Sequence, residues 1–125
     1  MSAGLTTLVL GASENPDRYS YMAIVQLRKE DHPVVAVGGR PGQVLDVPIV
    51  TALSTAWTID TVTLYLNSTL QQAYYDKILS LRPRRIIFNP GTENLEFATK
   101  AREAGIITQD ACTLVLLRTG QYHLY

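Results

Sequence analysis

The residues most able to bind a ligand in this chain lie in two short segments, each directly after an apolar run. The first, Gly11–Ser20, reads GASENPDRYS and contains Arg18. The second, Gly38–Pro41, reads GGRP and contains Arg40. Glycine lets a ligand approach the backbone, amides at a helix start bind anions, and arginine matches phosphate oxygens. The pattern predicts a phosphate site; the alternative is a tight turn beside two solvated arginines.

Neither segment carries a common nucleotide-binding motif. G-x-G-x-x-G is absent because Gly11 is the one glycine of the first loop, and no G-K-[ST] follows it. The second loop lacks the carboxylate with which NAD-binding folds hold the ribose, whereas Arg40 would suit an additional phosphate. The two candidate cofactors are therefore coenzyme A (CoA), with its 3′-phosphate, and NADP, with its 2′-phosphate.

Short apolar runs predict the strands that must position these loops. They lack a regular apolar–polar alternation, which is typical of parallel strands buried on both faces. The runs are Thr6–Leu10, Val34–Val37, Thr61–Leu66 and Arg85–Phe88, with a weaker fifth at Ile106–Ile107.

Helical spacing of apolar residues predicts helices between these strands. Helices are expected at Tyr19–Glu30, Ser68–Leu81 and Leu95–Ala104, the second opened by a capping box at Ser68–Gln71. The final apolar segment, Ala111–Leu117, fits either a strand or a helix. Pro41–Trp57 has no helical period, so we expect an irregular crossover with a short extended piece at Val47–Val50.

The alternation of strand and helix predicts an α/β fold. We expect a three-layer, Rossmann-like domain with a five-stranded parallel sheet in the order 3-2-1-4-5 and helices on both faces, with residues 1–125 as a single domain. In such sheets ligands bind outside the carboxyl ends of the strands, where the two arginine loops are expected.

Composition and charge exclude several classes of protein. Hydrophobic residues make up 46% of the 125 residues, too many for a disordered chain. Lys plus Arg and Asp plus Glu are 11 each, so we expect no broad basic field for nucleic acid or an anionic membrane. The single cysteine, Cys112, excludes an internal disulfide and a zinc site built on cysteines. Because there is no long apolar run and no signal-like start, we expect a cytoplasmic protein without a membrane partner.

The first loop resembles that of a known family. Gly11–Ser20 matches the pattern G-x-S-x-x-P-x-R-x-S at all five fixed positions. The pattern is typical of the small CoA-binding proteins, single-domain Rossmann-like relatives of the CoA-binding domain of the succinyl-CoA synthetase α subunit, and the likeness runs from Leu8 to Leu117. The family's V-N-P-K after the second strand becomes Val37–Arg40 here, which keeps the cation and loses the Asn and Pro. Further similar segments are Val44–Asp46, Pro48–Leu53, Asp60–Leu66, Asn89–Asn94 and the turn near Cys112.

The resemblance implies that three groups of residues bind three parts of CoA. The pyrophosphate would be held by the amides of Gly11, Ala12 and Ser13, the Ser13 hydroxyl, Arg18 and Ser20, with Tyr19 facing the ligand. The adenosine side would be lined by Gly39 and Arg40, with Arg40 near the 3′-phosphate. The pantetheine arm would be bordered by Asn89, Pro90, Gly91 and Asn94.

We therefore expect a protein that binds CoA or acyl-CoA and has no catalytic residue and no metal site. His32 and His123 have no evident carboxylate partner, and the phosphorylated histidine of the parent synthetase family lies in a separate domain. The alternatives are an NADP-dependent oxidoreductase, or its nucleotide-binding subunit, and a ligand-free interaction module. Cys112 is expected to be a buried small residue; the alternative is a thiolate that forms a mixed disulfide with CoA. A homodimer and an unidentified protein partner both stay open.

Overall fold

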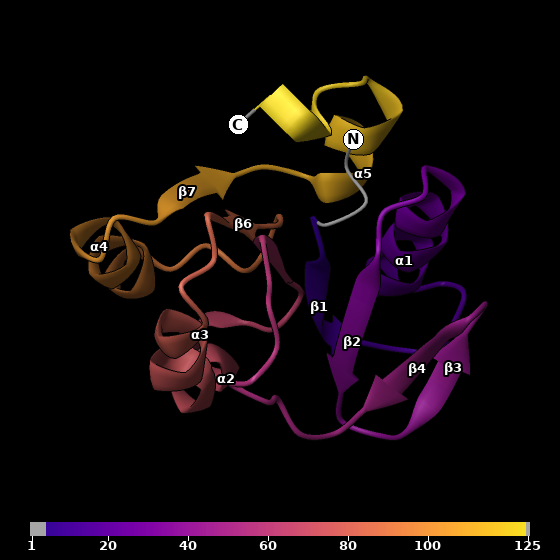
Figure 1. The fold of residues 1–125 in the computed structure, drawn as a ribbon, viewed down its shortest axis with the longest axis horizontal. Helices are drawn as coiled ribbons and strands as arrows, with labels where there is room; N and C mark the ends of the chain where they lie inside the picture. Colours follow the sequence, from indigo (N-terminus) through magenta and orange to yellow (C-terminus); the bar gives the residue numbers. More distant parts are fainter. Residues whose placement is uncertain (1–4, 125) are drawn as a thin grey trace.

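The computed structural model describes residues 5–124, which form one sheet between two layers of helices (Figure 1). The strands are β1 (Thr7–Ala12), β2 (Val34–Gly38), β3 (Gly42–Val44), β4 (Val47–Val50), β5 (Thr61–Leu64), β6 (Arg85–Phe88) and β7 (Ile107–Asp110). The α-helices are α1 (Tyr19–Lys29), α2 (Ser68–Gln71), α3 (Tyr75–Leu81), α4 (Leu95–Glu103) and α5 (Thr113–Arg118). Two 3₁₀ turns complete the chain, η1 (Gln72–Tyr74) and η2 (Tyr122–Leu124).

Within residues 5–124 the sheet has seven strands in the order β3-β4-β2-β1-β5-β6-β7. β1 lies at its centre, where Val9 is the register partner of Ala36 in β2 and of Thr63 in β5. All described neighbours run parallel except β3 and β4, which form an antiparallel hairpin at one end of the sheet. The carboxyl ends of β1, β2, β5 and β6 therefore share one edge, from which both arginine loops begin.

The predicted α/β fold with helices on both faces is confirmed, but the predicted five-stranded parallel sheet and its order are wrong. The strand predicted third, β5, lies beside β1 rather than beside β2. The place beside β2 is taken by β4, which was expected as an extended piece of a crossover. The β3–β4 hairpin explains the difference, because Val47 and Ile49 bury one face of β4 while Pro48 faces solvent. β4 lies between β3 and β2, and its proline, which cannot donate a hydrogen bond to the sheet, argues against a strand in the sequence.

The inner strands are buried on both faces, as their lack of alternation predicted. Leu8 and Leu10 of β1 pack with α3 and α4, where Phe97 is the largest helical side chain of the cluster. Val9 points to the other face and packs with Ile24 of α1 and with α5. The helices α2, α3 and α4 thus cover one face of the sheet and α1 and α5 the other (Figure 1).

The segment predicted as one helix over 68–81 is divided into α2, η1 and α3. The predicted capping box is also wrong, because the cap is Asn67, whose Oδ1 accepts a hydrogen bond from the Leu70 amide at 2.9 Å. Gln71, assigned to that box, is fully buried and donates to the carbonyls of Leu66 (2.9 Å) and Thr92 (2.7 Å). It therefore ties the loop after β5 to the loop after β6. The undecided segment 111–117 contains a helix, α5.

The carboxyl-terminal turn packs against the opposite, amino edge of the sheet. Arg85 is fully buried at the start of β6, and its Nη1 donates to the Tyr122 carbonyl at 2.7 Å. Its guanidinium also lies 4.4 Å from the centre of the Tyr122 ring. The Tyr122 hydroxyl shares a hydrogen bond with Thr7 at the start of β1. These contacts join η2 to two strands of the sheet.

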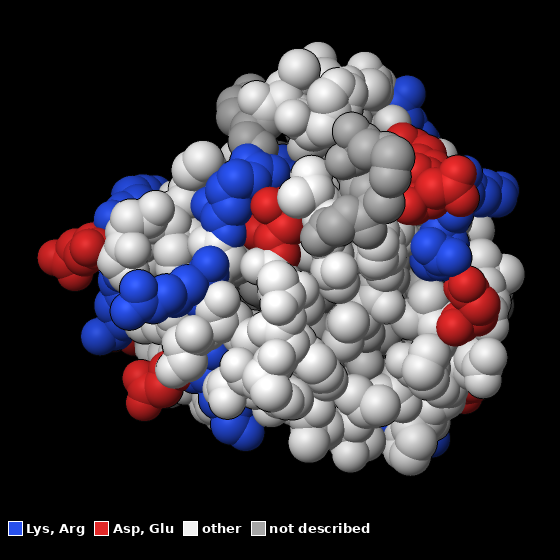
Figure 2. Space-filling model, in the orientation of Figure 1, with Lys and Arg blue, Asp and Glu red and all other residues white. Residues whose placement is uncertain are grey.

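Acidic and basic side chains are intermingled on the face shown in Figure 2, and no field of one sign covers its described atoms. This agrees with the equal numbers of acidic and basic residues in the sequence. Among residues 5–124, every helix is too short or too polar to cross a membrane.

Candidate functional site

The β1–α1 loop leaves the sheet through a turn at Gly11. Gly11 has a φ of +98°, and a Cβ atom there would lie 3.0 Å from the carbonyl carbon of Tyr65. A side chain is disfavoured by both the backbone conformation and the close approach. The Tyr65 amide donates to the Leu10 carbonyl at 2.8 Å. The loop after β1 therefore begins in contact with the residues that follow β5.

Polar side chains shape the rest of this loop. Ser13 Oγ accepts a hydrogen bond from the Asn15 amide at 3.0 Å, and Asn15 Oδ1 accepts one from the Asp17 amide at 2.9 Å. The Asn15 carbonyl accepts from the Arg18 amide at 3.0 Å. Side-chain turns of this kind fix a loop without regular secondary structure. They bring Arg18 to the N-cap position of α1.

The start of α1 offers several donors to an anion. Within the described residues, the Arg18 side chain makes no capping hydrogen bond, and the first turn of α1 contains no acidic residue. The amides of that turn therefore keep the partial positive charge of a helix start. Among residues 5–124, neither Arg18 nor Arg40 forms an ion pair. A phosphate group suits this combination of amides and arginines.

Four cavities formed by described residues lie along the carboxyl edge of the sheet. The loop cavity, of about 370 Å³, is lined by Ala12, Ser13, Glu14, Asn15, Gly39, Arg40 and Pro41. The helix-start cavity, of about 480 Å³, is lined by Gly11, Ser13, Asp17, Arg18, Tyr19, Ser20, Tyr65, Pro90 and Thr92. The α5 cavity, of about 340 Å³, is lined by Tyr19, Tyr65, Asn89, Pro90, Cys112, Leu114, Val115 and Arg118. The α2 cavity, of about 330 Å³, is lined by Leu10, Gly11, Val37, Gly38, Gly39, Leu66, Leu70, Ala73 and Tyr74.

The four cavities are neighbours that share lining residues, and Gly11 lines both the α2 cavity and the helix-start cavity. Gly39 lines both the α2 cavity and the loop cavity. Ser13 lines both the loop cavity and the helix-start cavity. The helix-start and α5 cavities share Tyr19, Tyr65 and Pro90. An elongated ligand could contact all four without leaving this edge of the sheet.

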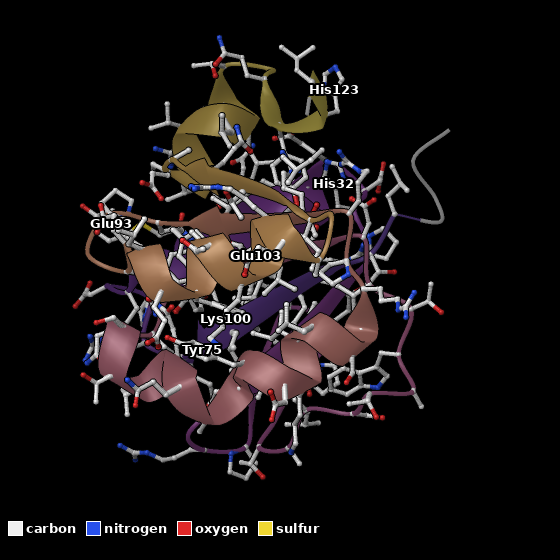
Figure 3. All side chains as sticks on the ribbon, turned by 90° about the vertical axis from the view of Figure 1, so that its left-hand side faces the viewer. His32, Tyr75, Glu93, Lys100, Glu103 and His123 are labelled. Carbon is white, nitrogen blue, oxygen red and sulfur yellow. The ribbon has the colours of Figure 1, made fainter. Side chains whose placement is uncertain are left out.

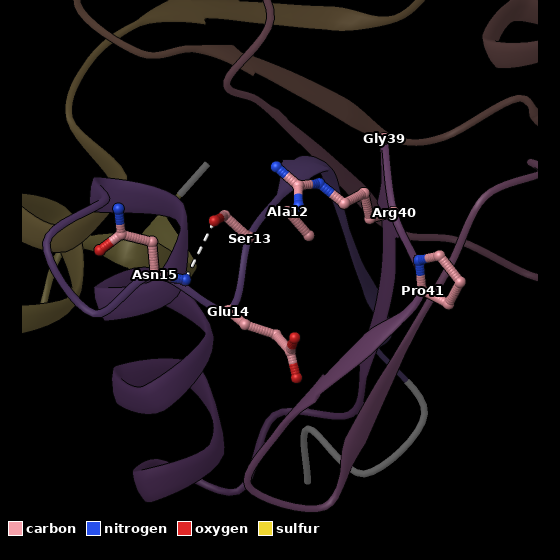
Figure 4. Close-up of a pocket in the computed structure, with 7 residues that line it drawn as sticks. All are labelled: Ala12, Ser13, Glu14, Asn15, Gly39, Arg40 and Pro41. Carbon is pink, nitrogen blue, oxygen red and sulfur yellow. Dashed lines mark hydrogen bonds between the residues drawn. The ribbon is translucent and has the colours of Figure 1, made fainter.

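Opposite charges meet in the loop cavity (Figure 4). The Arg40 side chain reaches back toward Ser13, while Glu14 turns toward the β3–β4 hairpin. Glu14 Oε2 accepts a hydrogen bond from the Gln43 amide at 2.9 Å. The second loop contributes no carboxylate, as predicted, but the first loop brings one into the same cavity. The sequence carried no signal for this, because the hairpin that holds Glu14 was not predicted.

The sequence of this chain matches one known protein family over most of its length. The family described as CoA binding domain matches residues 5–118. The chain belongs to this CoA-binding family. The resemblance found in the sequence is therefore confirmed, although the match itself identifies no ligand contact. No curated protein matches the chain.

Solved structures share the fold of this CoA-binding domain. A crystal structure described as an uncharacterized protein is 43% identical, with a TM-score of 0.91, over 95% of this chain and 98% of that chain. A protein from Thermus thermophilus is 23% identical, with a TM-score of 0.83, over 94% of this chain and 90% of its own. A hypothetical protein from Pyrococcus horikoshii OT3 is 24% identical, with a TM-score of 0.80, over 95% of this chain and 83% of its own. The last two likenesses concern the fold alone, and none of the three supports the NADP alternative.

Most residues predicted to contact the ligand of this CoA-binding domain line one of the four cavities. Among the described residues, Gly91 and Asn94 are the two exceptions. The Gly91 amide donates to Glu93 Oε1 at 2.9 Å. Asn94 caps α4: its Oδ1 accepts from the Phe97 amide at 3.1 Å, and its Nδ2 donates to Tyr75 and Gln71. Its side chain thus holds α4 to the segment that contains α2 and α3.

Asn89 lines the α5 cavity, but its amide is used within the fold. Nδ2 donates to Thr63 Oγ1 at 2.7 Å and to the Leu64 carbonyl at 2.8 Å. Oδ1 accepts from the Thr113 amide at 2.9 Å. Both N–H groups are therefore occupied, and Asn89 positions α5 against the ends of β5 and β6.

Tyr65 is the main cavity residue that the sequence analysis missed. It lines both the helix-start and α5 cavities of the CoA-binding domain. Burial raises the pKa of its phenol well above the usual range, and hydrogen bonds with Thr63 and Thr113 offset this only in part. The phenol therefore stays protonated at neutral pH. The residue went unnoticed because the apolar run continues to Leu66, whereas β5 ends at Leu64.

The remaining reactive side chains divide between the two edges of the sheet. Cys112 is half-buried rather than buried, and it lines the α5 cavity. His32 and His123 lie together at the other end of the molecule, far from the loops (Figure 3). Among residues 5–124, no group of three His, Cys, Asp or Glu side chains could hold a metal ion.

Proposed function

We propose that this chain binds CoA in an extended conformation along the carboxyl edge of the sheet. The observation that carries the proposal is the arrangement of four neighbouring cavities with different linings along this edge. The loop and helix-start cavities contain Arg40, Arg18 and the helix-start amides. The α2 and α5 cavities are lined mainly by apolar and aromatic residues, with Arg118 at one side of the α5 cavity. CoA has corresponding parts: an adenine, a phosphorylated ribose and pyrophosphate, and a pantetheine arm whose sulfur end would point toward the α5 cavity.

The pyrophosphate is assigned to the helix-start cavity. Its donors are the Gly11–Ser13 amides, the Ser13 hydroxyl, Ser20 and the Arg18 guanidinium. Support comes from the uncapped first turn of α1 and from the absence of any ion pair to Arg18 within residues 5–124. An arginine beside a helix start can donate to two phosphate oxygens at once.

The 3′-phosphate is assigned to Arg40, and adenine to the neighbouring α2 cavity. Gly39 is common to both cavities, so a ribose there would connect the two groups. Leu70 and Tyr74 offer apolar and aromatic surface to a base. Gly38 is required by the packing of the fold rather than by the ligand, since a Cβ atom there would collide with the Ala12 carbonyl.

The pantetheine arm is assigned to the path beside Pro90 and Tyr65, which leads from the helix-start cavity to the α5 cavity. Gly91 and Asn94 would then have no direct contact with the arm. They would shape the loop that contains Pro90 and the start of α4 that follows it. We assign no catalytic residue, so the chain would sense, carry or deliver CoA. Acyl-CoA would follow the same path.

The test is a calorimetric titration of ligand-free protein with CoA, dephospho-CoA, NADP and NAD. We expect CoA to bind, and dephospho-CoA to bind more weakly because it lacks the group assigned to Arg40. Arg40→Gln should weaken CoA binding and remove most of the difference between these two ligands. Arg18→Gln should weaken both ligands about tenfold or more, since a hydrogen bond to a charged group contributes about 1.5–3 kcal/mol.

The matched control is Lys100→Gln, which removes one exposed positive charge from α4 and lines none of the four described cavities (Figure 3). It should leave every affinity within error of the wild type. Tighter binding of NADP than of CoA would overturn the proposal, as would no binding of any of the four ligands. An equal loss in Lys100→Gln and Arg40→Gln would show a general charge effect and remove Arg40 from the site.

A further inference from the structure

The α5 cavity differs in chemistry from the two cavities assigned to phosphates. Its walls include Leu114 and Val115 of α5, and it shares Tyr19, Tyr65 and Pro90 with the neighbouring helix-start cavity. It lies beyond the pyrophosphate site, on the path given to the pantetheine arm. A group carried on the CoA sulfur would therefore enter it.

Arg118 lines one part of this cavity, and the polar atoms of Asn89 and Tyr65 there are used by the fold. Both N–H groups of Asn89 are bound to Thr63 and Leu64, and its oxygen accepts from Thr113. Burial raises the pKa of Tyr65, so its phenol is neutral. The part of the surface away from Arg118 thus suits hydrocarbon, because a buried polar group would lack free partners there.

The position of α5 is fixed by buried hydrogen bonds. Thr113 is fully buried, and its hydroxyl shares a hydrogen bond of 2.8 Å with the Thr63 hydroxyl. Its amide is bound to Asn89 at 2.9 Å. The wall formed by α5 is thereby joined to the ends of β5 and β6, so the fold itself sets the position of this wall. A preformed site loses less affinity to ordering on binding.

We propose that the α5 cavity is an acyl subsite, which binds a short apolar acyl chain carried as the thioester of CoA. The inference rests on the proposed function and adds the class of acyl group. The cavity has a volume of about 340 Å³, and an apolar cavity of about 150 Å³ already holds a benzene ring. Straight hydrocarbon chains longer than an acetyl group have room to bind.

The test measures dissociation constants for CoA and for acetyl-, butyryl-, hexanoyl- and octanoyl-CoA, with reductant present so that Cys112 and CoA stay thiols. We expect affinity to rise with chain length until the cavity is filled. The expected gain is up to about fourfold per methylene, which corresponds to about 0.8 kcal/mol for a buried methylene group. Succinyl-CoA, with the same number of acyl carbons as butyryl-CoA but a terminal carboxylate, should bind more weakly than butyryl-CoA.

A variant that fills the cavity tests the location. Val115 lines it and is 54% exposed on α5, so Val115→Tyr can add volume there without disturbing a core position. In this variant the ratio of the CoA and hexanoyl-CoA dissociation constants should fall toward one. The control is Leu95→Tyr on α4, a residue that is 77% exposed and lines none of the four described cavities. It should keep the wild-type ratio.

The outcomes separate this inference from the proposed function. If CoA itself does not bind, the proposed function fails and the acyl subsite fails with it. If CoA binds but affinity is independent of acyl length, the subsite alone is overturned. Tighter binding of succinyl-CoA than of butyryl-CoA would overturn the apolar class and point to Arg118 at this cavity. A chain-length dependence that survives in Val115→Tyr would place the acyl chain elsewhere.

Discussion

At the scale of single residues, the site is governed by Gly11 and by the charges that follow it. Gly11 turns the chain where no side chain fits easily, and the residues after it form the walls of two cavities. Glu14 and Arg40 then bring opposite charges into the loop cavity. The role of Gly11 in backbone conformation can be tested by the stability of the fold, and the role of the charges by the affinity for CoA.

Gly11→Ala should destabilise the fold. The substitution adds a Cβ atom 3.0 Å from the Tyr65 carbonyl carbon at a φ of +98°. We expect the free energy of unfolding in denaturant to fall by about 1–3 kcal/mol, the cost of a strained backbone position. Gly39→Ala is the control, because a Cβ atom there would meet no described atom within 4 Å. Equal stability of both variants would contradict the argument.

Glu14→Gln should tighten CoA binding. The amide oxygen can still accept from the Gln43 amide, while the negative charge beside the proposed 3′-phosphate is removed. We expect about a twofold to fivefold gain at low salt, since one exposed charge contributes about 0.5–1 kcal/mol. The gain, measured by calorimetry, should shrink at high salt because exposed charges are screened. The control Glu103→Gln on α4 should show no gain (Figure 3); weaker binding by Glu14→Gln would contradict the assignment.

At the scale of elements, buried amide side chains set how the helices meet the sheet. Gln71 joins the loops after β5 and β6, and Asn94 joins α4 to Gln71 and Tyr75. Asn89 fixes the start of α5. These side chains decide where the cavity walls stand, although none of them needs to contact the ligand.

Asn89→Ala should loosen α5 from the sheet. The change removes hydrogen bonds to the Thr113 amide and the Leu64 carbonyl, both made at a buried site. We expect a loss of about 2–3 kcal/mol in the free energy of unfolding, because buried partners are left unpaired. Hydrogen exchange should also speed up at the amides of α5.

The comparison variant is Asn67→Ala, which removes the exposed cap of α2. Loss of a cap should cost about 1 kcal/mol, and it should leave exchange in α5 unchanged. If exchange in α5 is as slow in Asn89→Ala as in the wild type, Asn89 does not hold this helix.

At the scale of the whole molecule, the two edges of the sheet differ in what they contact. The carboxyl edge carries the four cavities, and the amino edge is joined to the carboxyl-terminal turn. Arg85 and Tyr122 make that second contact, and the His32 ring packs edge-on against Tyr122 at 5.1 Å between ring centres. The stability of this packing should therefore depend on the protonation of His32.

Stability should fall as the pH is lowered below about 6.5, the usual pKa of histidine. Burial lowers the pKa of His32, and the charges of His123 and Arg85 add to this, against Glu30 and Asp31. The unfolded chain therefore binds the proton more tightly, so the free energy of unfolding is highest above that pH and declines toward the folded-state pKa. Denaturant titrations at pH 7.5 and 5.5 would measure the decline. His32→Phe should reduce it strongly, and His123→Phe only slightly because it removes one of the smaller causes of the lowered pKa; an unchanged decline in His32→Phe would contradict the assignment.

The fold class and the location of the site could be predicted because their signals are local. Apolar runs without alternation indicated buried parallel strands, and Gly11–Ser20 carried the loop motif in ten consecutive residues. The rule that ligands bind beyond the carboxyl ends of such strands then placed the site. Arg18, Ser20 and Arg40 accordingly line cavities at that edge.

The rest depended on which segments meet in space. The sequence determined a doubly covered α/β sheet, a phosphate-type loop and two arginines beside it. The tertiary structure alone decided that β4 takes the place beside β2 and that Glu14 shares a cavity with Arg40. It also decided that Asn89 accepts a hydrogen bond from the amide of Thr113 at the start of α5. The physical reason is that periodicity and turn chemistry act over a few residues, whereas strand order and tertiary hydrogen bonds join residues far apart in the sequence. Examples are Glu14 with Gln43, 29 positions apart, and Asn89 with Leu64, 25 positions apart.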